Sequence, residues 1–165
     1  MTTGEQKLTV GISELVVTDD PGALLVAHGL GSCLAIAAFS KSPLVAGMVH
    51  VMLPTAPGDG SFGNPALYAD TGIEALIEAM RAKGAKLEAT VFKLTGGAAV
   101  LRSNGTGARL QVGERNIEAA EAAFKRLGIR VRGRDVGGKR GRSVELDVAT
   151  GRVVVRTFGD EYREL

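Results

Sequence analysis

The chain contains one cysteine and two histidines, and two of these three residues lie where they could do chemistry together. Cys33 closes the glycine-rich segment Gly29–Cys33 directly ahead of an apolar run, and His50 lies within the next apolar run. A thiol beside an imidazole that can take its proton is the minimal activated nucleophile. The pair therefore predicts covalent catalysis at Cys33, with His50 as the base.

The residues between this pair predict the β-hairpin that would bring them together. Leu34–Phe39 and Leu44–Leu53 are apolar, strand-like runs, and Ser40–Pro43 between them is typical of a turn. Folding the hairpin about the middle of that turn places Cys33 directly opposite His50. Directly opposed residues have Cβ atoms about 4.5–5.5 Å apart, which lets two side chains share a proton. A one-residue bulge in either strand would destroy this register.

Both residues also have ordinary structural explanations. Free cysteine is among the most buried residue types, so Cys33 could be a small core residue. His50 could be a core histidine whose ring bonds to a backbone carbonyl. Two features favour catalysis: the glycines before Cys33 leave backbone N–H groups able to hold an oxyanion, and a polar ring in an apolar strand is costly without a partner. An activated Cys33 is expected to react with iodoacetamide well below about pH 8.5.

The sequence excludes several kinds of cofactor site. One cysteine and two histidines are too few soft ligands for zinc, and a lone cysteine forms no internal disulfide. Gly133–Lys139 matches the spacing of a P-loop, but Arg140 stands where the loop needs Ser or Thr. The strand-like Val144–Val148 follows where the loop needs a helix. Neither a metal nor another cofactor is expected.

Composition predicts a soluble globular protein with one domain over residues 1–165. Hydrophobic residues make up 45% and charged residues 23% of the 165, which are ordinary values. The first residues, Met1–Lys7, lack the apolar core of a signal peptide. The uncharged run Pro21–Ser40 is interrupted by glycines and a proline, which predicts strands and a turn instead of a membrane span. A cytoplasmic location without membrane insertion is expected.

Basic residues are dense between Arg126 and Arg142, although the net charge of the chain is only +2. No aromatic side chains interleave with these charges, so nucleic acid is not the expected partner. The cluster is interpreted either as a solvated face or as a docking surface for an acidic protein.

The periodicity of the rest of the chain predicts the elements that must position Cys33 and His50. Asn64 and Pro65 are typical of a helix start, with Gly84 as its stop, and a second helix is predicted over Glu114–Leu127. The predicted strands are Leu8–Ile12, Ala23–Ala27, Leu34–Phe39, Leu44–Leu53, Leu87–Leu94, Ile129–Arg132, Val144–Val148 and Val153–Phe158. Two helices against eight strands, several joined by hairpins, favour an α+β fold with mixed, largely antiparallel, sandwich-like sheets.

Several motifs together resemble the CheD family, the chemoreceptor glutamine deamidases of bacterial chemotaxis. The resemblance covers nearly the whole chain and is specific only as a joint pattern. The motifs are Leu30–Cys33, Gly47–Pro54, Tyr68–Asp70, Gly96–Ala98, Gly113–Asn116, Asp135–Gly138 and Gly141–Arg142.

This resemblance implies a cysteine hydrolase related in fold to bacterial toxin deamidases. Such an enzyme converts selected glutamine side chains of chemoreceptors to glutamate and releases ammonia, through a thioester intermediate. Cys33 matches the family's nucleophile and His50 its base. The implied partners are chemoreceptors as substrates and a CheC-type phosphatase.

The chain departs from the family's pattern at Ala27, where the family usually has a threonine. A third group that orients the histidine is part of triad logic, and Ala27 has no side-chain acceptor. The backbone of Ala27 is one candidate for that role, with Ser32 and Gly31 as further candidates for oxyanion support. The departure also motivates the alternative function, a weakly catalytic or non-catalytic adaptor that binds a CheC-like phosphatase or a receptor.

Overall fold

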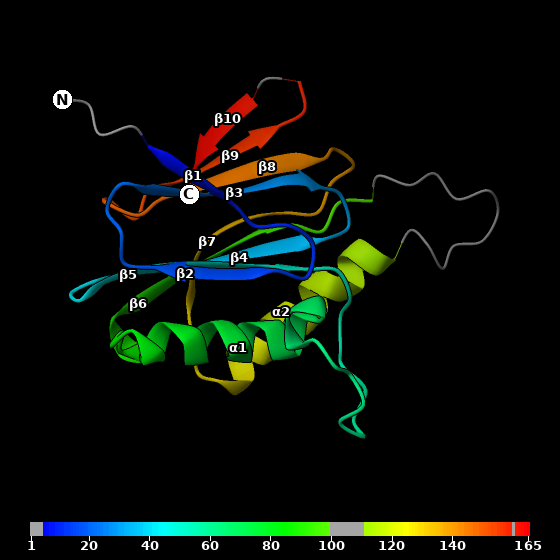
Figure 1. Cartoon of the computed structure of the whole chain (residues 1–165). Coiled ribbons are helices and arrows are strands. Elements are labelled where there is room, and N and C mark those ends of the chain that lie inside the picture. The colour runs from blue at the N-terminus through cyan, green and yellow to red at the C-terminus, as the bar shows by residue number, and fades with distance from the viewer. Residues whose placement is uncertain (1–4, 100–110, 160) are drawn as a thin grey trace.

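The computed structural model describes residues 5–99, 111–159 and 161–165. Two five-stranded sheets are stacked face to face, and both long helices lie along the outer face of the lower sheet (Figure 1). The sequence-based prediction of an α+β fold with sandwich-like sheets and two main helices is confirmed.

The upper sheet has the strand order β1-β3-β8-β9-β10, and the lower sheet has the order β2-β5-β4-β6-β7. Both are mixed, because β1 pairs with β3 and β6 with β7 in parallel, whereas the other neighbours are antiparallel. The upper strands are β1 (Gln6–Thr9), β3 (Ala23–Leu30), β8 (Arg142–Asp147), β9 (Val153–Thr157) and β10 (Glu161–Glu164). The lower strands are β2 (Leu15–Thr18), β5 (Leu44–Val51), β4 (Leu34–Lys41), β6 (Thr90–Gly96) and β7 (Val131–Val136).

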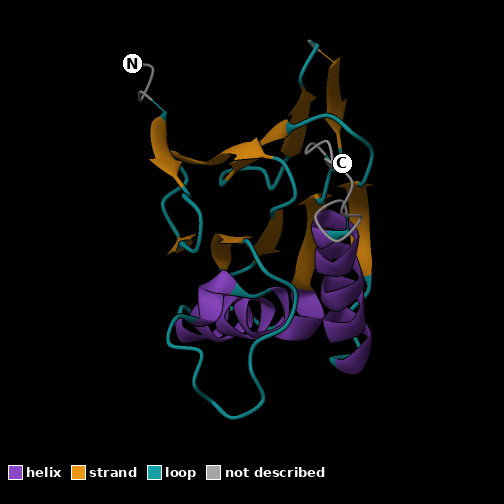
Figure 2. Cartoon of the chain, turned by 90° about the vertical axis from the view of Figure 1, so that its right-hand side faces the viewer, coloured by secondary structure: helices purple, strands orange, loops and turns teal. Residues whose placement is uncertain are grey.

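Two α-helices cover the lower sheet on the face turned away from the upper sheet (Figure 2). α1 (Ala69–Ala82) packs on β5 and β2, and α2 (Val112–Arg126) packs on α1 and β4. Asn64 is a helix N-cap as predicted, but the helix that it caps is the short 3-10 helix η1 (Pro65–Leu67). The α-helix α1 starts only at Ala69. A second 3-10 helix, η2 (Leu87–Ala89), precedes β6.

The lower sheet is buried on both faces, so the chain has two apolar layers. One layer lies between that sheet and the helices and includes Ile36, Val49 and Leu76. The other lies between the two sheets and includes Leu25, Cys33 and Met48. Burial on both faces explains why β5 is apolar at odd and even positions alike.

Sequence patterns missed two short strands. β2 and β10 have four residues each, and each pairs along one side only, at an edge of its sheet. β2 shows no alternation because it contacts both cores, with Leu15 and Val17 toward one and Val16 toward the other, whereas β10 is mostly polar and exposed. β2 matters for function, because it joins β5 beside His50.

Candidate functional site

Cys33 lies where the chain passes from the upper sheet to the lower one. β3 ends with a register shift between Ala27 and Leu30, and Gly29 there has φ +65°. The connection then delivers Cys33 to the first position before β4, with its side chain in the layer between the sheets and only 8% of its surface exposed. Burial raises the pKa of the Cys33 thiol, and an interaction with its own backbone N–H offsets part of the rise.

His50 lies near the end of β5, with 2% of its surface exposed. Its Nδ1 is 3.0 Å from the carbonyl oxygen of Val10. A carbonyl only accepts, so the neutral ring carries its proton on Nδ1 and keeps a lone pair on Nε2. Nε2 is buried and has no hydrogen-bond partner among the described residues. Burial lowers the pKa of His50, whereas the Val10 carbonyl and the charge of Glu14 raise it.

The predicted register between these two residues is wrong. In the β4–β5 ladder His50 faces Ala35, not Cys33, because the hairpin turns between Ser42 and Pro43, one residue later than expected. Moving the turn by one residue changes the pairing by two, which leaves every side chain on the same face. Cys33 and His50 are therefore diagonal neighbours on the face turned to the upper sheet, a relation that corresponds to about 7–8 Å in a regular ladder.

The backbone around Cys33 is held by the turn that follows β6. Gly97 N–H donates to the Cys33 carbonyl at 2.9 Å, and Ala98 N–H donates to the Gly31 carbonyl at 2.8 Å. Gly96 has φ +112°, and a Cβ there would lie 2.2 Å from the Cys33 carbonyl oxygen. Only glycine allows this close approach, so the turn after β6 fixes the position of the Cys33 backbone relative to β6.

Asn116 of α2 ties together the two segments that carry the candidate pair. Its Nδ2 donates to the Ser32 carbonyl at 2.8 Å and to the Met52 carbonyl at 3.0 Å. Asn116 is fully buried, and its Oδ1 has no hydrogen-bond partner among the described residues. Ser32 directly precedes Cys33, and only Val51 lies between His50 and Met52, so this amide couples the positions of thiol and imidazole.

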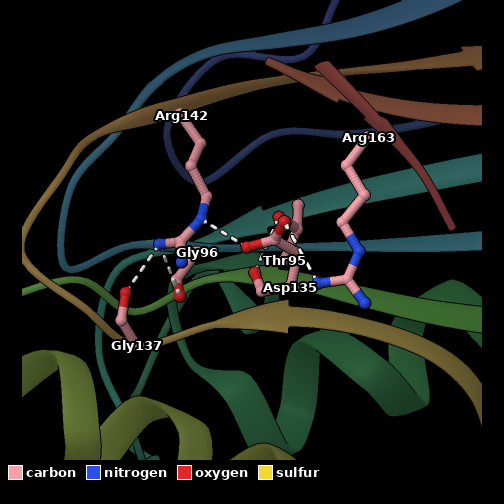
Figure 3. A network of polar contacts seen from close by, with 6 residues as sticks. All are labelled: Thr95, Gly96, Asp135, Gly137, Arg142 and Arg163. Carbon is pink, nitrogen blue, oxygen red and sulfur yellow. Dashed lines mark hydrogen bonds and ion pairs between the residues drawn. The ribbon is translucent and has the colours of Figure 1, made fainter. Parts of the chain in front are cut away.

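Arg142 of β8 supports the Gly96 turn from the other side (Figure 3). Its Nε donates to Asp135 Oδ1 at 2.9 Å, and its Nη1 donates to the carbonyls of Gly137 at 2.8 Å and Gly96 at 3.4 Å. Arg163 lies 3.8 Å from the other oxygen of Asp135. Arg142 is thus a buried structural cation.

Three members of the basic cluster form ion pairs within the chain. Arg126 pairs with Glu74 on α1, Arg134 pairs with Glu121 on α2, and Arg142 is buried against Asp135. Arg142 is an interior cation, whereas Arg126 and Arg134 connect neighbouring helices and strands. The interpretation of the cluster as a docking surface therefore has less support for these three residues.

The structure places the three further candidates of the sequence analysis as follows. The carbonyls of Gly31 and Ser32 accept from Ala98 N–H and Asn116 Nδ2, which fixes this backbone in place. Oxyanion support needs donors, so from these residues it would come from their N–H groups or the Ser32 hydroxyl. Ala27 is buried and pairs with Val144. His50 Nδ1 contacts the carbonyl of Val10, a group from another segment, and not that of Ala27, which was one candidate for orienting the ring.

Comparison with known proteins identifies the family. Residues 52–157 match the sequence model described as "CheD chemotactic sensory transduction". A protein of Symbiobacterium thermophilum is 43% identical over 94% of this chain and 95% of its own length. The chain belongs to the CheD family. The segment matched by the family model begins after Cys33 and His50, whereas the full-length relative spans both positions.

Other CheD proteins are similar over the same extent. "Chemoreceptor glutamine deamidase CheD" of Thermotoga maritima is 39% identical over 93% of both chains. A relative from Haloarcula marismortui is 44% identical over 92% of this chain and 86% of its own. Among solved structures, Neisseria meningitidis protein NMB0706 aligns with a TM-score of 0.46 at 10% identity, covering 81% of this chain and 62% of that one.

The described residues contain neither a membrane-spanning helix nor a cluster of metal ligands. Over residues 5–99, 111–159 and 161–165, no helix has the length and apolarity needed to cross a membrane. Within the same ranges, no three His, Cys, Asp or Glu side chains gather as a metal site would require.

Proposed function

We propose that this CheD-family chain is a chemoreceptor glutamine deamidase in which Cys33 is the nucleophile and His50 the general base. The observation that carries the proposal is the state of the His50 ring. Its Nδ1 is bound to the Val10 carbonyl, and its Nε2 is buried and unpartnered on the face that also holds Cys33. A buried nitrogen lone pair without a donor costs folding free energy, and a catalytic role is one explanation for keeping such a group.

The resting pair is neutral, and this determines how the first step proceeds. Burial raises the pKa of the Cys33 thiol and lowers that of His50, so both effects oppose a thiolate–imidazolium pair. The thiol proton therefore moves to Nε2 as sulfur attacks the side-chain amide carbon of glutamine. The Cys33 N–H, which acts to lower the pKa of its own thiol, is suited to stabilise the oxyanion that forms.

The remaining steps return the proton and consume one water. The imidazolium gives its proton to the amide nitrogen, ammonia leaves, and a thioester links Cys33 to the former glutamine. Water then attacks the thioester carbon while Nε2 accepts a water proton. Sulfur leaves and regains a proton from His50, and glutamate is released.

Site-directed variants test this assignment on receptor fragments, with mass spectrometry of the Gln-to-Glu conversion as the readout. Cys33→Ser and His50→Gln are expected to abolish conversion while keeping the fold, because each replacement is close in size. Thr90→Val is a matched control, since it removes a side-chain hydrogen bond to the Lys86 carbonyl before β6. Conversion by Cys33→Ser at the wild-type rate would refute Cys33 as the nucleophile.

The adaptor function remains the second candidate, because a buried thiol with a raised pKa is also what an inert structural cysteine shows. The adaptor function predicts that the wild type binds a CheC-type phosphatase or a receptor and deamidates nothing. It also predicts that Cys33→Ser leaves the binding affinity unchanged. Binding measured by calorimetry beside the conversion assay separates the two functions. A cytoplasmic location and a CheC-type binding partner are also part of the proposed function. Both rest on the family resemblance.

A further inference from the structure

The connection between β1 and β2 holds His50 at three points. The Val10 carbonyl accepts from the ring, Ser13 N–H donates to the His50 carbonyl at 2.8 Å, and His50 N–H donates to the Glu14 carbonyl at 3.0 Å. Ser13 adopts φ +63°, which lets the chain turn back so closely. The ring and the backbone of His50 are therefore positioned by the same short segment.

Within this segment, the peptide group that joins Val10 and Gly11 is hydrogen-bonded at both ends. Its carbonyl faces His50 Nδ1 at 3.0 Å, and its N–H donates to Glu14 Oε2 at 2.7 Å. The second bond has an ionised acceptor and is among the stronger types. Hydrogen bonds in a chain polarise one another, by about 10–30% per bond. A negative charge on Glu14 thus makes the Val10 carbonyl a better acceptor for the imidazole N–H.

We propose that Glu14 is a positioning residue for the deamidation, acting on His50 through the Val10–Gly11 peptide group. This inference rests on the proposed role of His50 as the base. In a triad, a carboxylate fixes the tautomer of the histidine and stabilises the imidazolium by direct contact. Here one peptide group stands between carboxylate and ring, bonded to both.

The proton count is unchanged by this arrangement. The thiol proton moves from Cys33 to Nε2, the Nδ1 proton stays on the ring, and no proton crosses the peptide group. The titratable groups near the ring are Glu14 on the β1–β2 connection and Cys33 at the entry to β4. Burial lowers the pKa of His50, and the negative charge of Glu14 raises it. The effect of Glu14 thus favours the imidazolium that forms when His50 accepts the thiol proton. Glu14 is exposed, so solvent screens part of its charge.

Two variants separate the charge of Glu14 from its hydrogen bond. Glu14→Gln keeps an oxygen acceptor for Gly11 N–H and removes the charge, whereas Glu14→Ala removes both. Nitrogen-15 NMR of the ring resolves the outcome without turnover, because the chain has only one other histidine, His28. We expect Glu14→Gln to keep the Nδ1–H tautomer and to lower the pKa of His50. Glu14→Ala should also mix the tautomers.

The kinetic effect should fall on kcat and leave KM unchanged. We expect Glu14→Gln to lower kcat about threefold to tenfold, part of the roughly 10²–10⁴-fold that a general base contributes. Glu14→Ala should lower kcat further. Asp20→Asn is the matched control, because Asp20 also accepts from a turn amide, Gly22 N–H at 2.9 Å, and should leave kcat and the His50 pKa unchanged.

The inference is overturned if Glu14→Gln and Glu14→Ala leave the pKa and tautomer of His50 as in the wild type. It is overturned as well if the pKa moves while kcat stays constant. Neither result bears on Cys33, whose role is judged by the Cys33→Ser variant. Failure of the proposed function is thus distinguishable from failure of this inference.

Discussion

Replacement of Asn116 by alanine tests how the helix layer positions the nucleophile. The variant removes two hydrogen bonds, to the carbonyls of Ser32 and Met52, at 2.8 and 3.0 Å. Each such bond contributes about 1 kcal/mol net, and an unpaired buried partner adds a penalty of about 1–3 kcal/mol. Asn116 is fully buried, so both carbonyls would lose a donor from the interior side.

A second effect partly offsets this loss. Asn116 Oδ1 is already buried without a partner, and the alanine variant removes that penalty. The free energy of unfolding should therefore fall by only about 1–3 kcal/mol, which corresponds to about 2–4 °C in Tm per kcal/mol for a chain of this size. The protein should remain folded at the assay temperature.

The activity should fall by more than this stability change explains. Asn116 couples the segments that carry Cys33 and His50, and a displacement of about 1 Å in a catalytic group can cost about 10²-fold in rate. We expect kcat for glutamine conversion to drop by roughly 10- to 100-fold, measured well below Tm, with urea denaturation giving the stability. Ser40→Ala is the control, because Ser40 is fully buried and donates to the Pro43 carbonyl at the far end of β4. Equal kcat in both variants would refute the coupling.

Three further predictions concern the surroundings of the pair. The raised thiol pKa reverses the sequence-based expectation for iodoacetamide: the rate of Cys33 alkylation should keep rising above about pH 8.5, because burial lowers the thiolate fraction at any given pH. A rate that is already at its plateau near neutral pH, and that His50→Gln reduces, would contradict the neutral resting pair. Gly96→Ala should lower the unfolding free energy by about 2–6 kcal/mol, from φ strain plus the clash with the Cys33 carbonyl; an unchanged denaturation midpoint would show that the turn can move. Arg142→Met should lower it by about 3–5 kcal/mol because it leaves Asp135 buried beside only the distant Arg163; adding Asp135→Asn should recover part of the loss, and no recovery would mean that the ion pair is not the cause.

The sequence predicts the fold well where apolar periodicity is strong. β3, β4 and β5 lie close to their predicted ranges, because each is buried at most successive positions and so requires a continuous apolar run. The hairpin register is predicted less well, because turn composition alone does not show whether the chain reverses before or after Ser42. The face of each side chain nevertheless survives this error, since the side-chain period of a strand is two.

The candidate site is predictable in its reactive atoms and unpredictable in its supports. Cys33 and His50 are singled out by residue type, but the Val10 carbonyl is a backbone atom and has no sequence signal. Asn116 and Glu14 are distant in sequence from both Cys33 and His50. Local periodicity therefore does not indicate that they lie close to the pair in the fold. Arg142 was grouped with surface cations because the sequence does not show that β8 buries it against Asp135.

The chain changes sheets twice at the site, and this has a mechanical consequence. β1 to β2 and β3 to β4 both pass from the upper to the lower sheet, at the same end of the sandwich in Figure 1. The first crossing carries the Val10 carbonyl and the second carries Cys33. Cys33 and His50 are both bonded to the lower sheet or to the segments that join it, so they would keep their mutual position if the sheets shifted relative to one another. The two crossings therefore anchor the reactive pair to one sheet, while β1 and β3, the strands that lead into the crossings, belong to the other.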